Sequence, residues 1–253
     1  MAHTLKEINS QKIKGMNIAL IGYGRMGHEI EEIAVARGHA IKLVIDIDNT
    51  GDLNKENMKD IDIVIEFSSP HSAFENISRC LSMKIPVVSG TTGWLNDYDK
   101  AEDICKKNRT AFIHSSNFSI GVNLLFRLST ELAKQMAHYK DYTVSIEEIH
   151  HTKKLDSPSG TAIFIADGIK NQHPGYKGWC FEYQKEDNLI PVRSVREGVV
   201  PGTHTVLWDS MVDTISIRHE AKNRKGFALG AVIAAEFIRN RKGVFTMDDI
   251  LGF

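Results

Sequence analysis

Cysteine, proline and long apolar runs are all scarce in this chain. Its 253 residues include three cysteines and six prolines. Because Cys80, Cys105 and Cys180 are widely spaced and form no metal-ligand pattern, they argue against a disulfide framework and indicate a reducing compartment. No stretch approaches the roughly 18 consecutive apolar residues of a membrane-spanning helix, so the sequence predicts no membrane partner.

Neither sign of charge predominates. The chain has 31 Lys and Arg against 32 Asp and Glu, a formal net charge of -1. Binding to nucleic acid needs a basic surplus to neutralise phosphates, so no nucleic-acid partner is predicted. The first fifteen residues are polar and lack the apolar segment of a signal peptide, and we expect them to form a loose leader. These features together predict a cytoplasmic protein.

The amino-terminal part places a glycine-rich turn between a short apolar strand and a helix. The expected strand covers residues 16–21, and a second strand over residues 41–45 ends in Asp46. This order is typical of a dinucleotide-binding fingerprint, in which glycines let the pyrophosphate approach and the later carboxylate binds a ribose hydroxyl. The alternative is a tight turn without a ligand. The turn consists of Gly22, Tyr23, Gly24, Arg25, Met26 and Gly27.

Strands and helices continue to alternate up to about residue 121. This alternation predicts an α/β fold with a Rossmann-type doubly wound parallel sheet, whose ligands bind at the carboxyl ends of the strands. Three strand exits are rich in small polar residues that can line a cofactor channel, although each alone is also typical of an ordinary turn. The first lies at residues 68–70. The other two contain Gly90, Thr91 and Thr92, and Ser115, Ser116, Asn117 and Phe118.

After Gly121 the pattern changes to strands with period two. Such strands are expected at residues 190–196, 204–208 and 213–218, and they predict a smaller domain with a mixed or antiparallel sheet. Its outer face is expected to keep apolar side chains that pack against a second copy, namely Val206, Trp208, Ile215 and Ile217. A last helix over residues 227–239 has the apolar pattern of a helix that packs on the first domain.

The densest set of chemically reactive side chains lies between residues 146 and 162. Here an expected strand runs into two histidines and two lysines, His150, His151, Lys153 and Lys154, and then into the start of a helix. A helix N-terminus presents unpaired amides and a partial positive charge. Ser159, Gly160 and Thr161 are therefore candidates to bind a carboxylate or phosphate.

A histidine that changes protonation near neutral pH and a cationic lysine would lie beside this anion site. The cluster thus predicts a proton donor next to an anion cradle, and the alternative is a polar loop on the surface. The two histidines lack the glutamate and the third-ligand spacing of zinc motifs, so no metal is predicted.

Four motifs resemble those of the dihydrodipicolinate reductases, also called 4-hydroxy-tetrahydrodipicolinate reductases, of bacterial lysine and diaminopimelate biosynthesis. They are GRMG at residues 24–27, SGTTG at 89–93, NFSIGVN at 117–123 and EIHHTKKLDSPSGTA at 148–162. The resemblance implies a dinucleotide-binding domain at residues 1–121, a mixed α/β substrate-binding and tetramerisation domain at 122–224, and a C-terminal segment, 225–253, whose helix returns to the first domain. It also implies a homotetramer.

The resemblance assigns roles by motif position. His150 corresponds to the catalytic acid/base and Lys154 to the proton donor of a reaction that reduces a cyclic imine with two carboxylates. The substrate would be held by His151, Lys154, Ser159, Gly160, Thr161 and Arg224. The cofactor, NADH or NADPH, would contact residues 22–27, Asp46, residues 90–92 and residues 115–118.

Two alternatives stay open at this point. One is another NAD(P)-dependent oxidoreductase that acts on amino acids or sugars, and the other is a non-catalytic NAD(P)-sensing module. The His-His-x-x-Lys and Ser-Gly-Thr arrangement argues against both, because a sensor needs no proton donor beside an anion cradle. Asp46 should repel the 2′-phosphate of NADPH, and Ile47 follows it where the family often has arginine. The sequence therefore predicts a modest preference for NADH.

Overall fold

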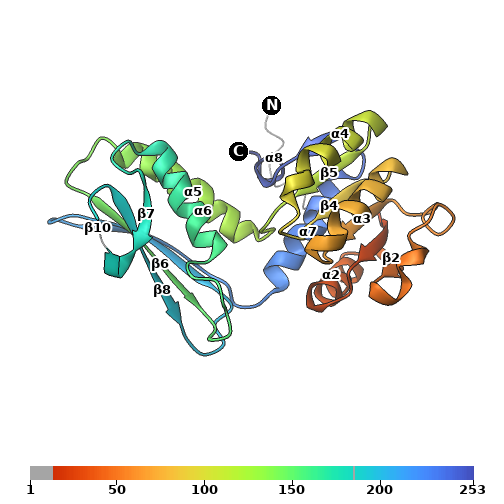
Figure 1. Ribbon diagram of the computed structural model, residues 1–253, viewed down its shortest axis with the longest axis horizontal. Helices are drawn as coiled ribbons and strands as arrows, with labels where there is room; N and C mark the ends of the chain where they lie inside the picture. Colours follow the sequence, from red (N-terminus) through yellow and green to blue (C-terminus); the bar gives the residue numbers. More distant parts are fainter. Residues whose placement is uncertain (1–13, 185) are drawn as a thin grey trace. The chain divides into compact units, whose positions relative to one another are not determined.

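The computed structural model describes residues 14–184 and 186–253, so the expected leader lies, apart from its last two residues, outside the described part. The chain divides into two compact units (Figure 1). The first unit runs to Ile120 and includes Lys225–Phe253. The second unit comprises Gly121–Arg224.

The first unit is built on a six-stranded parallel sheet in the order β11-β5-β4-β3-β1-β2. Its central strands are short apolar runs buried on both faces, as is usual for parallel sheets. This sheet confirms the predicted Rossmann-type fold. The strands are β1 (Asn17–Ile21), β2 (Ala40–Ile45), β3 (Ile63–Glu66), β4 (Val87–Ser89), β5 (Ala111–His114) and β11 (Gly243–Phe245).

Helices cover both faces of this sheet. Apolar side chains of α2 and α7 pack in one core on one face, and those of α3 and α4 pack in a second core on the other face. The helical elements are α2 (Arg25–Ala36), η1 (Ile47–Asp52), α3 (Pro70–Ser82), η2 (Leu95–Asp97), α4 (Tyr98–Asn108), α7 (Lys225–Ile238) and α8 (Met247–Leu251). The short elements η1, β11 and α8 are not predicted from the sequence.

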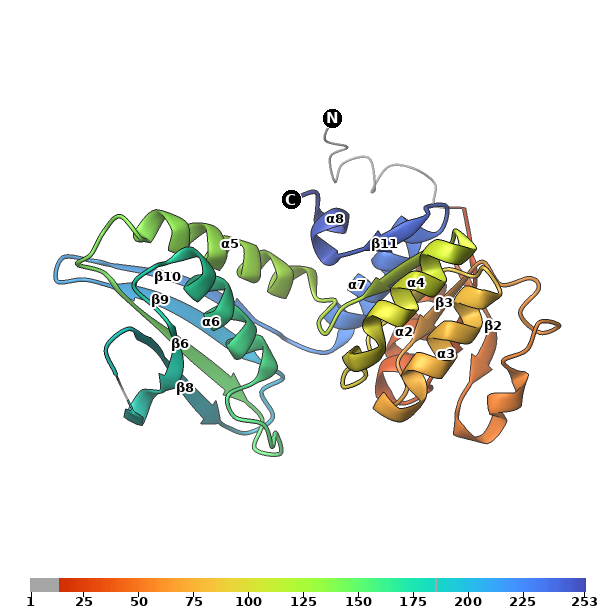
Figure 2. The ribbon, with the colours of Figure 1, turned by 45° about the horizontal axis from the view of Figure 1, so that its top comes forward.

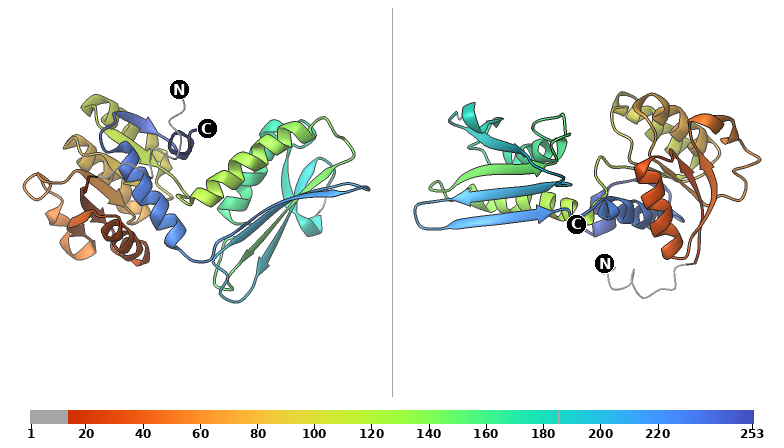
Figure 3. Two further views of the ribbon diagram at one scale, coloured as in Figure 1. Left: turned by 180° about the vertical axis from the view of Figure 1, so that it is seen from behind. Right: turned by 90° about the horizontal axis from the view of Figure 1, so that it is seen from below.

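The second unit is a mixed five-stranded sheet in the order β10-β9-β6-β8-β7. Strand β6 is parallel to β8 and antiparallel to β9. Figure 2 shows α5 and α6 lying over one face of this sheet, and Figure 3 gives the same arrangement from two other sides. The elements are α5 (Ile120–Met136), β6 (Thr143–His150), α6 (Gly160–Gln172), β7 (Gly178–Phe181), η3 (Glu182–Gln184), β8 (Leu189–Arg196), β9 (Thr203–Asp209) and β10 (Thr214–Glu220).

The expected outer face of this second sheet is wrong. Val206 and Trp208 are fully buried and pack in the core beneath α5 and α6, and Ile217 packs against the same core. Of the four residues, Ile215 alone has an exposed side chain. Period two correctly groups these residues on one face, because alternate residues of a strand share a face. It does not say which face the helices cover. The helix-free face carries the partly exposed side chains of Ile149 and Leu207 instead.

Within the described ranges, residues 14–184 and 186–253, no helix combines the length and the apolar character that crossing a membrane would require.

Candidate active site

The glycine turn after β1 adjoins the end of β2, as the dinucleotide fingerprint requires. The amide of Gly22 donates to the carbonyl of Ile45 at 2.8 Å, so the turn and Asp46 lie at neighbouring strand ends. Gly22 has a φ of +87°, and a Cβ there would overlap the carbonyl oxygen of Phe67, so the backbone requires glycine. Asp46 is exposed at the end of β2.

No contact among the residues that the structure describes requires glycine at position 24, and the space beside its backbone is open. It is the N-cap residue of α2, and a Cβ there would meet no atom within 4 Å. Gly27, by contrast, is required by packing, because its Cβ would lie 2.6 Å from the Gly22 carbonyl oxygen. A helix N-terminus next to open space suits the pyrophosphate of a dinucleotide. Arg25 is exposed at the first position of α2, Met26 packs against the core, and the Tyr23 hydroxyl donates to Glu31.

A fully buried glutamate, Glu66, ties together the exits of β3 and β4. It accepts hydrogen bonds from Ser89 Oγ at 2.6 Å, from Thr91 Oγ1 at 2.8 Å and from the Ser68 amide at 3.0 Å. The Ser68 hydroxyl donates to it as well. Because these donors lie on both exits, the carboxylate fixes the two loops relative to each other.

The structure separates the expected cofactor residues at these exits into buried and exposed ones. The Thr91 side chain is buried against Glu66, and Gly90 is required because a Cβ there would overlap the Phe67 ring. The Phe118 side chain lies in the core. Thr92 and Ser116 are exposed. The Ser115 hydroxyl donates to the Asn117 carbonyl at 2.8 Å and accepts from the Asn117 amide at 3.2 Å, so both residues are tied within their loop.

In the second unit, reactive side chains converge at one end of the sheet. Strands β6 and β8 are parallel, so His150 pairs in register with Arg196 at their carboxyl ends. Strand β9 runs the other way, so its start lies at the same end and His204 pairs with Glu148. These four side chains come from three strands, and the helix α6 begins beside them.

Glu148 is the centre of this cluster. It is 0% exposed, its Oε2 lies 2.5 Å from His150 Nδ1, and its Oε1 accepts from Arg196 Nη2 at 2.9 Å. Burial alone would raise the pKa of the Glu148 carboxyl, but the hydrogen bonds from His150 and Arg196 outweigh it and hold that pKa well below its usual range. Glu148 is therefore a buried anion at neutral pH.

The two buried histidines of the cluster face each other. The rings of His150 and His204 are 5.1 Å apart and nearly perpendicular. Burial, assisted by the nearby His150, lowers the pKa of His204 to about 3. His204 is thus neutral at physiological pH, and its Nε2 lies 3.1 Å from the Ser159 hydroxyl oxygen.

Glu148, His150 and His204 also form a group whose potential metal-ligand atoms lie within 4.8 Å of one another. The 2.5 Å separation of Glu148 Oε2 and His150 Nδ1 is a hydrogen-bond distance. Two ligands of one zinc ion, each about 2.0–2.2 Å from it, lie roughly 3 Å apart or more. These two atoms are therefore too close together to be ligands of one zinc ion.

The three residues expected to bind an anion lie at the start of α6. Ser159 is its N-cap, with the hydroxyl accepting from the Ala162 amide at 3.2 Å and its own amide donating to Glu148 at 3.2 Å. Gly160 and Thr161 follow in the first turn, where amides have no intrahelical acceptor. Gly160 is exposed, and a Cβ there would meet nothing within 4 Å. An anion can therefore approach this backbone closely.

The two lysines of the loop between β6 and α6 differ in their surroundings. Lys154 is 22% exposed and its ammonium bonds both carboxylate oxygens of Asp156, at 2.7 and 2.8 Å, whereas Lys153 is exposed. His151 is half-buried directly after β6. Arg224 is exposed at the last position of the second unit, just before α7.

Three members of the cluster were given no role by the sequence interpretation, namely Glu148, Arg196 and His204. Glu148 could have been found from the sequence, because residues two apart on a strand share a face and Glu148 is two residues before His150. Arg196 and His204 could not, since they join the site only through the order of strands in the sheet.

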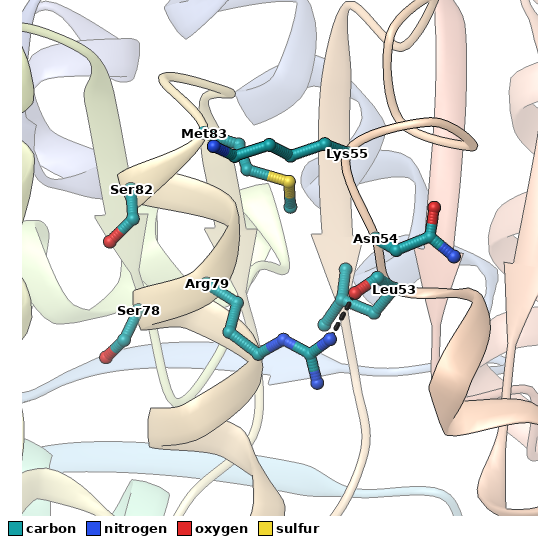
Figure 4. A pocket seen from close by; sticks show the side chains of 7 residues that line it. All are labelled: Leu53, Asn54, Lys55, Ser78, Arg79, Ser82 and Met83. Atoms are coloured by element: carbon teal, nitrogen blue, oxygen red, sulfur yellow. Dashed lines mark hydrogen bonds between the residues drawn. The ribbon is translucent and has the colours of Figure 1, made fainter.

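A surface pocket of about 360 Å³ lies elsewhere in the first unit, between the end of η1 and the second half of α3 (Figure 4). The Arg79 guanidinium donates to the Leu53 carbonyl there. It is lined by Leu53, Asn54, Lys55, Ser78, Arg79, Ser82 and Met83, none of which belongs to the strand exits described above.

Comparison with known proteins identifies the family. The model described as "Dihydrodipicolinate reductase, N-terminus" matches residues 16–118, and that described as "Dihydrodipicolinate reductase, C-terminus" matches residues 121–251. The chain belongs to the dihydrodipicolinate reductase family. The expected resemblance is thereby confirmed.

Curated dihydrodipicolinate reductases match over nearly their whole length. The 4-hydroxy-tetrahydrodipicolinate reductase of Christiangramia forsetii is 54% identical over 236 residues, covering 93% of this chain and 98% of the relative. That of Thermosipho africanus is 34% identical over 239 residues, with the same coverage of 93% and 98%.

A solved structure described as dipicolinate-bound dihydrodipicolinate reductase from Paenisporosarcina sp. TG-14 shares the fold. It has a TM-score of 0.74 at 24% identity and covers 92% of this chain and 98% of that one.

Proposed function

We propose that this chain reduces the cyclic imine dicarboxylate 4-hydroxy-tetrahydrodipicolinate to tetrahydrodipicolinate with NADH or NADPH, in lysine and diaminopimelate biosynthesis in the cytoplasm. The observation that carries the proposal is the cluster at the end of β6, where the Glu148 carboxylate contacts both His150 and the amide of Ser159, the N-cap of α6. Family membership, and relatives of that name matched over nearly their full length, support it.

The residues of the second unit have distinct tasks in this proposal. The N-terminal amides of α6, at Gly160 and Thr161, bind one substrate carboxylate, and Lys154 and His151 bind and balance negative charge. The bound nicotinamide supplies a hydride to the ring. We assign the protonation of the adjacent ring carbon to His150 in place of Lys154, to which the resemblance gives the donor's role, because His150 is buried in the cluster whereas Lys154 pairs with an exposed carboxylate. In balance, the hydroxyl group first leaves with a neighbouring ring proton as water, which gives a conjugated cyclic imine. This imine then gains the hydride on one ring carbon and the proton on the next.

The residues of the first unit hold the cofactor in this proposal. The Gly22–Gly27 turn and the start of α2 bind the pyrophosphate, and Asp46 accepts hydrogen bonds from the adenosine ribose. The exposed Thr92 and Ser116 face the cofactor at the remaining strand exits. Glu66 makes no cofactor contact in this proposal and serves only to hold the loops after β3 and β4 in place.

The function is tested by cofactor oxidation with freshly generated pathway substrate. Purified protein should oxidise NADH or NADPH in the presence of this substrate and not with amino acids, oxo acids plus ammonia, or sugars. Faster turnover with any of those would favour another amino-acid or sugar oxidoreductase. Nucleotide binding without turnover on any of them would favour a sensing module.

We predict a modest preference for NADH. Asp46 lies exposed at the end of β2, and its charge should repel a 2′-phosphate, while Ile47 supplies no guanidinium to pair with it. Replacing Asp46 by serine should therefore move the ratio of kcat/KM values towards NADPH. Replacing the exposed Arg25 by alanine should weaken NADPH more than NADH. A wild type that strongly prefers NADPH, with a ratio that Asp46→Ser leaves unchanged, would remove Asp46 from the ribose site.

We also propose that the chain forms a homotetramer through the helix-free face of the second sheet. That face carries the partly exposed Ile149, Val195 and Leu207, and family membership supports the assembly. Light scattering at micromolar concentration should give the mass of a tetramer. Leu207→Glu should lower that mass, whereas Met211→Glu, a change at a fully exposed turn residue, should not. A monomeric wild type would contradict the proposal.

A further inference from the structure

The carboxylate of Glu148 joins the two halves of the proposed active site. One oxygen, Oε2, lies 2.5 Å from His150 Nδ1. The other, Oε1, accepts from Arg196 Nη2 at 2.9 Å and from the Ser159 amide at 3.2 Å. The same Arg196 nitrogen donates to the Asp156 carbonyl at 2.6 Å. Because Oε1 is held from two neighbouring elements, the carboxylate is locked with Oε2 directed at His150.

This arrangement determines which nitrogen of His150 carries a proton. An ionised carboxylate only accepts hydrogen bonds, so the facing Nδ1 must be protonated. The other nitrogen, Nε2, lies beside Gly202, where a Cβ would come within 3.0 Å of it. Glycine at this position keeps a side chain away from Nε2. The ring of His204 is the titratable group that faces this ring, with the two centroids 5.1 Å apart.

We propose that Glu148 is a positioning residue that holds His150 in the Nδ1–H tautomer, so that Nε2 is the nitrogen that exchanges a proton with the substrate. This inference rests on the reductase function proposed above. In the protonating step the Nε2–H bond of the imidazolium breaks, and the proton joins the ring carbon next to the one that received the hydride. The electron pair of the enamine forms the new C–H bond. The neutral imidazole keeps its proton on Nδ1, facing Glu148.

Replacing Glu148 by glutamine reverses this tautomer without changing the shape of the side chain. The amide oxygen of the glutamine must occupy the Oε1 position, because Arg196 and the Ser159 amide both need an acceptor there. The amide NH₂ group then faces His150 Nδ1. Since this group only donates, Nδ1 must accept and the ring proton moves to Nε2. A neutral His150 in this tautomer presents the wrong nitrogen to the substrate.

The tautomer is measured directly by NMR, from the ¹⁵N chemical shifts of the imidazole nitrogens in protein that carries ¹⁵N-labelled histidine, at a pH where His150 is neutral. The chain has 11 histidines, and the resonances of His150 are assigned by their absence in His150→Gln. We expect Nδ1–H in the wild type and Nε2–H in Glu148→Gln. We also expect kcat to fall about 10²- to 10⁴-fold in that variant, the range seen when a catalytic histidine loses its tautomer or its proton transfer. The Kd for NADH should stay unchanged.

The matched control is Glu147→Gln. Glu147 is the preceding residue of β6, it points to the opposite face, and it likewise pairs with an arginine, with Oε2 3.3 Å from Arg193 Nη1. This variant should keep the wild-type turnover and tautomer. Glu148→Asp retains an anionic acceptor, so it should keep the Nδ1–H tautomer and recover part of the lost turnover.

Two results would overturn the inference. One is an Nε2–H tautomer in the wild type, a result that does not depend on the folding of Glu148→Gln. The other is wild-type turnover in Glu148→Gln when His150→Gln is inactive. A wild type with no reductase turnover would instead remove the proposed function. The tautomer measurement needs no substrate and would still decide whether Glu148 places the proton on His150.

Discussion

Replacing His150 by glutamine should lower the turnover of the reductase reaction by about 10²- to 10⁴-fold, because the variant cannot transfer a proton to the ring carbon. This loss corresponds to about 3–5 kcal/mol in the activation barrier. His150 is 7% exposed and contacts Glu148 and His204 in the second unit. The Kd for NADH, which depends on the first unit in this account, should be unchanged. Steady-state kinetics and fluorescence titration with NADH measure the two quantities.

The adjacent His151→Gln serves as the contrast. His151 is half-buried and is assigned to substrate binding, so its replacement should raise KM more than it lowers kcat. Thermal unfolding should show that both variants remain folded. If His150→Gln keeps a kcat within a few-fold of the wild type, His150 is not the acid and the assignment fails.

Replacing Lys154 by alanine should lower kcat/KM by about 10²-fold or more, because the ammonium group stabilises negative charge on the substrate after hydride addition. In the structure this group pairs with the exposed carboxylate of Asp156. A pair of this kind contributes at most about 1 kcal/mol to stability, so a substrate carboxylate can displace Asp156 and the variant should remain folded.

Lys153→Ala is the matched control for Lys154. Lys153 is the exposed neighbour in the same loop, and its removal should change kcat/KM by no more than a few-fold. If kcat/KM falls further in Lys153→Ala than in Lys154→Ala, Lys153 is the functional lysine. The role given to Lys154 from its position in the family motif would then be wrong.

The Rossmann-type sheet was predictable because its signals are local. The Gly22–Gly27 turn follows a short apolar strand, and the backbone of Gly22 tolerates only glycine, so sequence and structure report the same constraint. The short strands β7 and β11 carry no such signal, because they begin with glycine and are mostly half-buried, whereas the similarly short β4 is a fully buried run that follows a helix. Their pairing with β8 and β5 depends on residues far along the chain.

The error at Trp208 has a different cause. Alternation shows that Val206 and Trp208 share a face, but the choice of face depends on where α5 and α6 pack. The same limit applies to the active site. The sequence places Glu148 and His150 on one face of β6, yet the contact of Arg196 with Glu148 spans 48 residues and follows from the order of strands. Strand order is a property of the whole sheet and has no signature in a local stretch.

The central claim is that this chain transfers a hydride from a nicotinamide cofactor to the ring of its substrate and then protonates that ring. Mass spectrometry of the product formed from freshly generated substrate and NADH deuterated at C4 of the nicotinamide tests it most directly. The account predicts one deuterium per product molecule for one of the two stereoisomers of labelled NADH, with tetrahydrodipicolinate as the product. Oxidation of NADH without deuterium in the product, or no oxidation with this substrate, would contradict it.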